Sequence, residues 1–165
     1  MRSLAKRNVN LAVFVIVIAV LQTTIFNHLK IYNVKPNILV IVAICFSLYE
    51  KSILSAALFG MICGVVLDAI GGGAFGVNAI LCMYVSIAST VLSSRFFQGK
   101  VSVSLLFTCI FCLVYEVLLY TLCIYLWEKG DYTATMLDII LPTVLYNIIL
   151  SVPLYFFMRR YQIAD

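Results

Sequence analysis

Long apolar stretches run through almost the whole sequence, and they constrain the fold more than any other feature. Stretches of roughly twenty residues match the length at which an α-helix, rising about 1.5 Å per residue, crosses a hydrocarbon core of about 30 Å. Hydrophobic residues make up 64% of the 165 positions and charged residues only 11%, and the mean hydropathy is +1.12. An ordinary soluble domain is far less apolar. We therefore expect a single all-α, polytopic integral membrane domain over residues 1–165.

Six transmembrane helices are predicted from the apolar stretches and the polar breaks between them. Their expected bounds are about 9–26, 37–49, 52–70, 77–93, 101–127 and 135–158. The second stretch is short for a full crossing, so we expect it to be tilted, kinked or locally re-entrant. The first stretch follows a basic head like that of a signal peptide, but no small-residue cleavage pair comes after it, which favours an uncleaved helix.

The basic residues predict the orientation of these helices. Six crossings place eight of the eleven Lys and Arg residues on one side, against three on the other, and the positive-inside rule makes the richer side cytoplasmic. The inner set is Arg2, Lys6, Arg7, Lys51, Arg95, Lys100, Arg159 and Arg160, and the outer set is Lys30, Lys35 and Lys129. Both termini are then cytoplasmic. Since the basic residues form no patch, nucleic acid is not an expected partner, whereas the lipid bilayer is.

Small residues recur at every fourth position in the third stretch. Ser52, Ala56, Gly60, Gly64 and Asp68 follow one another at this spacing, so neighbouring members share a helix face with almost no side-chain bulk. Close backbone approach at small residues is a main way for helices to associate in lipid. Gly60 and Gly64 also form a G-x-x-x-G pattern, for which packing within the chain is the default interpretation. We predict Ala56, Gly60 and Gly64 to be helix-packing residues.

Glu116 is the acidic residue predicted deepest in the membrane. It lies eleven residues before Trp127, about 16 Å by helical rise. Asn147 lies at a similar depth in the last helix, so a side-chain hydrogen bond between antiparallel neighbours could keep Glu116 protonated. A proton or cation relay is the alternative, but relays usually need chains of acidic or His groups. We favour a fold-locking role for Glu116 and Asn147.

Asp68 lies nearer the outer boundary, just before a glycine-rich turn. We expect its carboxylate to accept hydrogen bonds from backbone N–H groups of that turn or of the following helix N-terminus, whose dipole suits a negative charge. This fold-locking role is preferred to catalysis. The turn glycines are Gly71, Gly72, Gly73 and Gly76. Pro36, Pro142 and Pro153 are expected to start or kink helices.

No pattern in the sequence indicates enzymatic chemistry. All six cysteines lie in apolar stretches, where a thiol behaves as a small hydrophobe. Cys109 and Cys112 match C-x-x-C but have neither a βαβ context nor a basic neighbour, so packing is favoured over redox or metal binding. His28 has no ligand set near it. With no nucleophilic triad, phosphate-binding loop or zinc spacing, we expect no catalytic residue, no metal and no cofactor.

Several motifs in order resemble the MreD family of rod shape-determining membrane proteins. The first group is Lys35-Pro36-Asn37, then Gly60-x3-Gly64-x3-Asp68, then Gly73-x2-Gly76-x-Asn78-Ala79. The second group is Leu141-Pro142-Thr143 with Asn147, and Pro153-x-Tyr155 before Arg159-Arg160. The sequence departs from the family at Asn37, where the family commonly has Asp.

The resemblance implies a non-enzymatic scaffold in the bacterial cytoplasmic membrane. Such proteins bind MreC and help to link MreB filaments to the RodA glycosyltransferase and its penicillin-binding transpeptidase, which build the lateral wall. The family is also similar in architecture to the substrate-binding subunits of energy-coupling-factor vitamin transporters, which gives an alternative function. Those subunits carry A-x-x-x-A on helix 1, whereas Ala12 is followed four residues later by Ile16, and Ala19 by Thr23. The missing pattern counts against transport.

Overall fold

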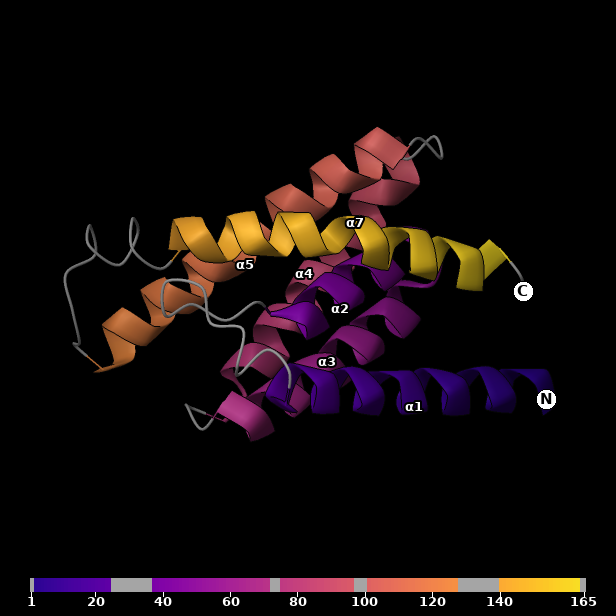
Figure 1. Ribbon diagram of the computed structural model, residues 1–165, viewed down its shortest axis with the longest axis horizontal. Helices are drawn as coiled ribbons and strands as arrows, with labels where there is room; N and C mark the ends of the chain where they lie inside the picture. Colours follow the sequence, from indigo (N-terminus) through magenta and orange to yellow (C-terminus); the bar gives the residue numbers. More distant parts are fainter. Residues whose placement is uncertain (1, 25–36, 72–74, 97–100, 128–139, 164–165) are drawn as a thin grey trace.

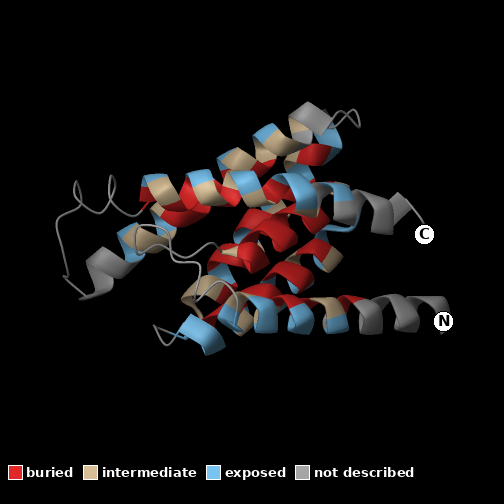
Figure 2. Cartoon of the chain, viewed as in Figure 1, coloured by how far each residue is buried: buried red, intermediate tan, exposed pale blue. Residues whose placement is uncertain are grey.

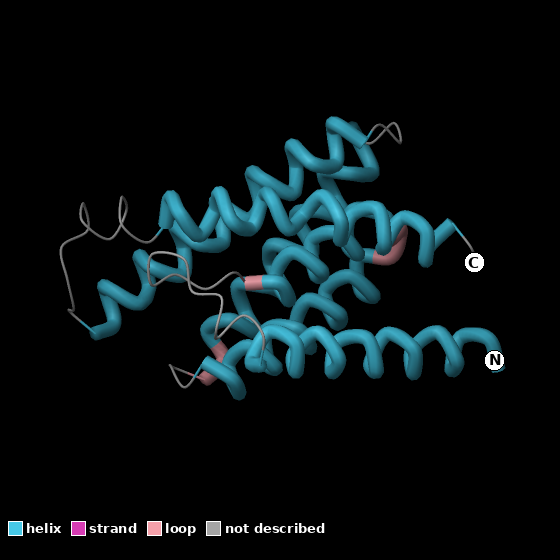
Figure 3. The backbone as a smooth tube through the Cα atoms, viewed as in Figure 1, coloured by secondary structure: helices cyan, strands magenta, loops and turns pink. Residues whose placement is uncertain are grey.

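In the part of the chain that the structure describes, the regular elements are all helices (Figures 1 and 3). This computed structural model describes residues 2–24, 37–71, 75–96, 101–127 and 140–163. The helices are α1 (Arg2–Thr24), α2 (Ile38–Tyr49), α3 (Ile53–Gly71), α4 (Val77–Phe96), α5 (Val101–Trp127) and α7 (Leu141–Ile163). Over the described ranges, the predicted all-α class is confirmed.

Three of these helices are long and apolar enough to cross a membrane. They contain the candidate spans Ile53–Gly71, Val77–Arg95 and Leu105–Leu122. The other three helices contain shorter apolar segments, Val13–Thr24, Ile38–Tyr49 and Leu141–Leu154. Length and composition therefore support three spans, and the count of six crossings stays a prediction.

The helix bounds differ from the expected ones mainly where polar residues flank an apolar stretch. The bounds of α5 agree at both ends, whereas α1 begins seven residues early at Arg2 and α4 extends to Phe96. The last helix runs from Leu141 to Ile163, and the expected residues 135–139 lie outside the described part of the chain. Apolarity marks the part of a helix suited to lipid, but backbone hydrogen bonding continues into the polar flank.

Ser52 was expected inside the third helix, at the start of its small-residue face, and this is wrong. The residue is exposed and lies just before α3. Its Oγ accepts a hydrogen bond from the Ser55 N–H at 3.3 Å, and its carbonyl accepts one from the Ala56 N–H at 3.0 Å. Ser52 therefore caps the helix, as serine commonly does, because the first N–H groups have no partner within the helix.

The short helix α2 lies at the centre of the bundle. It contacts α1, α3, α4, α5 and α7, and eleven of its twelve residues are buried (Figure 2). Its sequence, ILVIVAICFSLY, is apolar on every side, which is typical of a helix enclosed by others. Twelve residues rise only about 18 Å, less than the hydrocarbon thickness. By itself, α2 therefore spans only part of that thickness.

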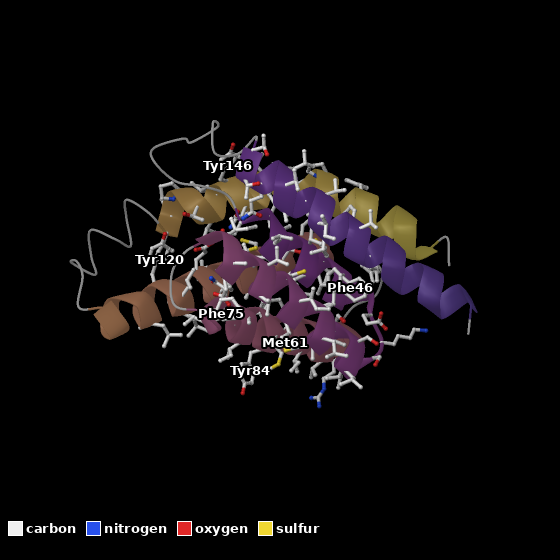
Figure 4. The ribbon with its side chains drawn as sticks, turned by 90° about the horizontal axis from the view of Figure 1, so that it is seen from below. Phe46, Met61, Phe75, Tyr84, Tyr120 and Tyr146 are labelled. Carbon is white, nitrogen blue, oxygen red and sulfur yellow. The ribbon has the colours of Figure 1, made fainter. Side chains whose placement is uncertain are left out.

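The remaining helices surround α2 and turn apolar side chains outward. Ile16 on α1, Leu54 on α3, Tyr84 on α4 and Ile149 on α7 are all more than 60% exposed. Tyr84 points away from the ribbon in Figure 4. An apolar exterior of this kind suits lipid. The start of α1 and the end of α7 lie toward the same end of the molecule (Figure 1).

Candidate functional site

The small-residue face of α3 is covered by α4. Ala56, Gly60 and Gly64 are all buried, and α3 and α4 form the most extensive helix pair. A Cβ atom added at Gly60 would lie 2.7 Å from the Cys82 carbonyl oxygen, and one added at Gly64 would lie 2.7 Å from the Ala79 backbone nitrogen. Real Cβ atoms essentially never approach another atom this closely. Glycine at these two positions therefore allows α4 to approach.

At the end of this contact, Asp68 caps the start of α4. Its Oδ2 accepts hydrogen bonds from the N–H groups of Gly76 at 2.9 Å and Ala79 at 3.1 Å. Its Oδ1 accepts from the Asn78 N–H at 3.1 Å and from Asn78 Nδ2 at 2.9 Å. These are the kinds of donor expected from the sequence, since the first N–H groups of a helix lack partners and its dipole favours a carboxylate. We call Asp68, Gly76, Asn78 and Ala79 the Asp68 cluster.

Of the two described glycines that were predicted to form the turn, only Gly76 lies in it. Gly71 was assigned to the turn, but it is the last residue of α3, because the helix continues past the apolar stretch. Gly76 does lie in a turn, with a φ angle of +101° that favours glycine. Gly72 and Gly73 lie outside the described residues.

A second polar cluster surrounds Glu116 and joins three helices. Glu116 Oε1 accepts hydrogen bonds from Asn37 Nδ2 at 2.8 Å and from Asn147 Nδ2 at 3.4 Å. The backbone N–H of Asn37 donates to Asn147 Oδ1 at 3.0 Å, which closes the triangle. Glu116 and Asn147 are each 1% exposed or less. The hydrogen bond expected between them is present, and Asn37 is a third partner that the sequence reasoning missed. We call these residues the Glu116 cluster.

Gln22 adds a further contact at the start of α2. Its Oε1 accepts a hydrogen bond from the Leu39 N–H at 3.2 Å. Backbone groups at membrane depth must find partners within the protein. Gln22 from α1 and Asn147 from α7 thus satisfy two N–H groups where the short central helix begins. Gln22 also escaped the sequence reasoning, although a glutamine that ends an apolar stretch was a usable signal.

Tyr115 connects the two clusters. It precedes Glu116 on α5, is only 1% exposed, and donates a hydrogen bond from its hydroxyl to Asn78 Oδ1 at 2.6 Å. Neighbouring residues of one helix therefore reach different clusters, since successive side chains point about 100° apart. The two clusters form one polar core near the end of the bundle where α2 and α4 begin.

Comparison with known families identifies the kind of protein to which this core belongs. The model of the family described as rod shape-determining protein MreD matches residues 3–163. The chain belongs to the MreD family. Neither a curated protein nor a solved structure matches it.

This family match confirms the resemblance that the sequence motifs indicated. It supports a role for this chain in rod shape determination. The MreD family consists of shape-determining structural membrane proteins and is not a known enzyme family. The motif residues Gly60, Gly64, Asp68 and Asn78 all belong to the contact between α3 and α4. In this MreD-family chain, these motifs thus form one structural unit, the helical hairpin of α3 and α4.

The two described prolines of the MreD-like motifs both lie in α7, one at its start and one in its interior. Pro142 is the second residue of α7, where the missing N–H of proline removes no helical hydrogen bond. Pro153 lies inside the same helix. Pro36 lies outside the described residues.

The described residues offer little for metal or redox chemistry. No group of three or more His, Cys, Asp or Glu side chains in this part of the chain could hold a metal ion. The five described cysteines are free thiols, and all except Cys109 are buried. What the polar core can do chemically is to connect helices through hydrogen bonds.

Proposed function

We propose that this protein is a non-enzymatic scaffold subunit of the bacterial cell-elongation complex. It binds MreC and links MreB filaments to the RodA glycosyltransferase and its penicillin-binding transpeptidase during lateral wall synthesis. It crosses the cytoplasmic (inner) membrane six times, with both termini inside the cell. The observation that carries this proposal is the MreD family match over residues 3–163.

The packing of the bundle supports a scaffold. α2 is enclosed by five helices, and the polar core connects α1, α2, α5 and α7 on one side and α3, α4 and α5 on the other. Buried, satisfied polar networks favour one arrangement of a core. A partner would therefore meet a bundle of defined shape, with recognition through its outward apolar faces.

The arrangement of the ends supports the proposed topology. The start of α1 and the end of α7 lie toward the same end of the molecule, which agrees with an even number of crossings. Arg2, Lys6 and Arg7 then share a side with Arg159 and Arg160, as the positive-inside rule requires.

Site-specific photocrosslinking in cells tests the proposed binding of MreC. Each variant carries one crosslinking amino acid at an exposed position of a different outer helix. The positions are Ile16, Ile62, Tyr84, Leu118 and Ile149, and buried Ile41 is the control. We expect crosslinks to MreC from one face of the bundle, copurification of MreC from detergent, and round cells on depletion. Absence of every MreC crosslink together with unchanged cell shape would refute the proposal. Uptake of a vitamin-like solute would instead support the transporter alternative.

A further inference from the structure

A cavity of about 330 Å³ lies beside the polar core, among α1, α2, α3, α4 and α5. The polar side chains of its described lining are Gln22, Thr23, Asn37, Asn78 and Tyr115. Thr23 on α1 and Ile70 and Gly71 on α3 also line the cavity and are exposed, so the cavity reaches the surface between the ends of these two helices. Its volume falls at the lower end of the range for small-molecule sites, about 300–1,000 Å³.

Two amide side chains in the lining have groups to spare. Asn37 uses its Nδ2 for Glu116, and Gln22 uses its Oε1 for the Leu39 N–H. Among the described residues, nothing pairs with Asn37 Oδ1 or Gln22 Nε2. These two lining residues therefore keep one acceptor, Asn37 Oδ1, and one donor, Gln22 Nε2, that a ligand can use.

The hydroxyl groups of the lining add mainly acceptors. Thr23 Oγ1 donates to the Val20 carbonyl at 3.0 Å, and the Tyr115 hydroxyl donates to Asn78 Oδ1. Each oxygen keeps lone pairs that can accept a hydrogen bond. A molecule bearing several hydroxyl groups can both donate to these oxygens and accept from Gln22.

The charge around the cavity disfavours an anion. None of the described lining residues is charged, and two carboxyl groups lie behind them, Glu116 bonded to Asn37 and Asp68 bonded to Asn78. Within the described part of the chain, a phosphate or carboxylate ligand would therefore meet acceptors and carboxyl groups and no cation in the lining. The apolar side chains of Leu67, Ile70 and Leu119 suit the carbon face of a ring or chain.

We propose that this cavity binds an uncharged, hydroxyl-bearing group, either a free sugar or polyol, or the sugar head group of a glycolipid. Such binding is separate from partner binding by the scaffold, so the two proposals stand or fall independently. Binding would occupy the polar core at the point where α1, α2 and α3 meet.

The test uses the full chain purified in detergent, with binding followed by native mass spectrometry and by the shift in melting temperature. The probes are free glucose, a monoglucosyl diacylglycerol and, as the charged comparison, phosphatidylglycerol. Glucose binding alone identifies a free sugar site, and preference for the glucolipid identifies a head-group site. Failure of both glucose probes to bind at millimolar concentration would overturn the proposal, as would equal binding of phosphatidylglycerol.

Two variants locate the binding in the cavity. A Cβ at Gly71 would meet no atom within 4 Å, so Gly71→Phe has room to fill the opening, and it should weaken binding at least tenfold. Thr23→Val removes one hydroxyl without changing volume, and we expect a several-fold loss, with Thr24→Val as the matched control outside the lining. If Gly71→Phe does not fold, Thr23→Val decides. Binding unchanged in every folded cavity variant would place the ligand elsewhere and overturn the proposal.

Discussion

The Asp68 cluster and the Glu116 cluster each centre on one carboxyl group, but they are built over very different distances along the chain. The described partners of Asp68 lie eight to eleven residues away, in the turn and first residues of α4. Glu116 reaches Asn147 across 31 residues and Asn37 across 79 residues. The Asp68 cluster closes one helical hairpin, whereas the Glu116 cluster can form only when three helices have come together.

The two carboxyl groups therefore contribute to the bundle in different ways. The donors to Asp68 are mostly backbone N–H groups, which stay in place when a side chain changes. The donors to Glu116 are the side-chain amides of Asn37 and Asn147, which can rotate or be replaced. We therefore expect Asp68 to fix local geometry, and Glu116 to select how α2, α5 and α7 assemble.

The largest effect is expected from Asp68→Leu. The change leaves the N–H groups of Gly76, Asn78 and Ala79 without acceptors, which should lower the free energy of unfolding by on the order of 4 kcal/mol. Asp68→Asn should cost about half as much, since one oxygen remains. Unfolding in mixed detergent micelles measures both, with Ser94→Ala as control. A loss smaller than that for Glu116→Leu would reverse the comparison.

The next largest losses of stability are expected from substitutions of the glycines of α3, and the structure predicts their order. Gly64→Ala should cost the most, about 2–3 kcal/mol, because its Cβ would meet the backbone of Ala79. Gly60→Ala should cost less, since two of the three nearest atoms belong to the Ser86 side chain, which can give way, and only the Cys82 carbonyl oxygen is backbone. Gly71→Ala should cost almost nothing, because a Cβ there would meet nothing within 4 Å. Melting temperatures of the three variants test this order. In cells, Gly60→Leu and Gly64→Leu should reduce the protein level and give round cells. Normal protein levels and rod-shaped cells would contradict the role of these glycines in helix packing.

Double-mutant cycles test the long-range cluster. Glu116→Leu combined with Asn37→Leu should show a coupling of about 1 kcal/mol, and with Asn147→Leu a smaller one, because the hydrogen bonds measure 2.8 Å and 3.4 Å. Glu116→Leu with Ser94→Ala should be additive, as no contact joins them. Plain additivity for both asparagines would show that the cluster contributes no cooperative stability.

The smallest effect is expected from Tyr115→Phe, which removes the hydrogen bond between the clusters. We expect a loss of about 0.5–1 kcal/mol, with Tyr84→Phe, on the outer surface, as control. In the Tyr115→Phe background, the effects of Asp68→Asn and Glu116→Leu should become additive. Coupling that persists without the hydroxyl would mean that the clusters communicate by another route.

The local half of this core could be predicted from the sequence. Four-residue spacing gives the packing face of α3, and a carboxylate before a glycine turn indicates the cap of the next helix. The pair of Glu116 and Asn147 followed from matching their depths on two antiparallel helices. Each of these inferences needs only the geometry of one helix or of two helices crossing the same bilayer.

The central place of α2 and the roles of Asn37 and Gln22 could not be predicted in this way. In a membrane protein, lipid-facing and buried side chains are both apolar, so an apolar pattern does not reveal which helix is enclosed. The partners of Asn37 and Gln22 depend on that arrangement. The short length of α2 was the feature that set it apart in the sequence, and the expectation drawn from it, a tilted, kinked or locally re-entrant segment, stays a prediction.

The twelve residues of α2 have a consequence for biogenesis. A helix of this length leaves part of the bilayer unspanned, and where it begins the Leu39 N–H finds its acceptor on α1 and the Asn37 N–H finds its acceptor on α7. Because α7 follows α2 in the chain by about ninety residues, the start of α2 gains its acceptor on α7 only after α7 has been made. Truncated chains that lack α7 should therefore be targets for membrane proteases.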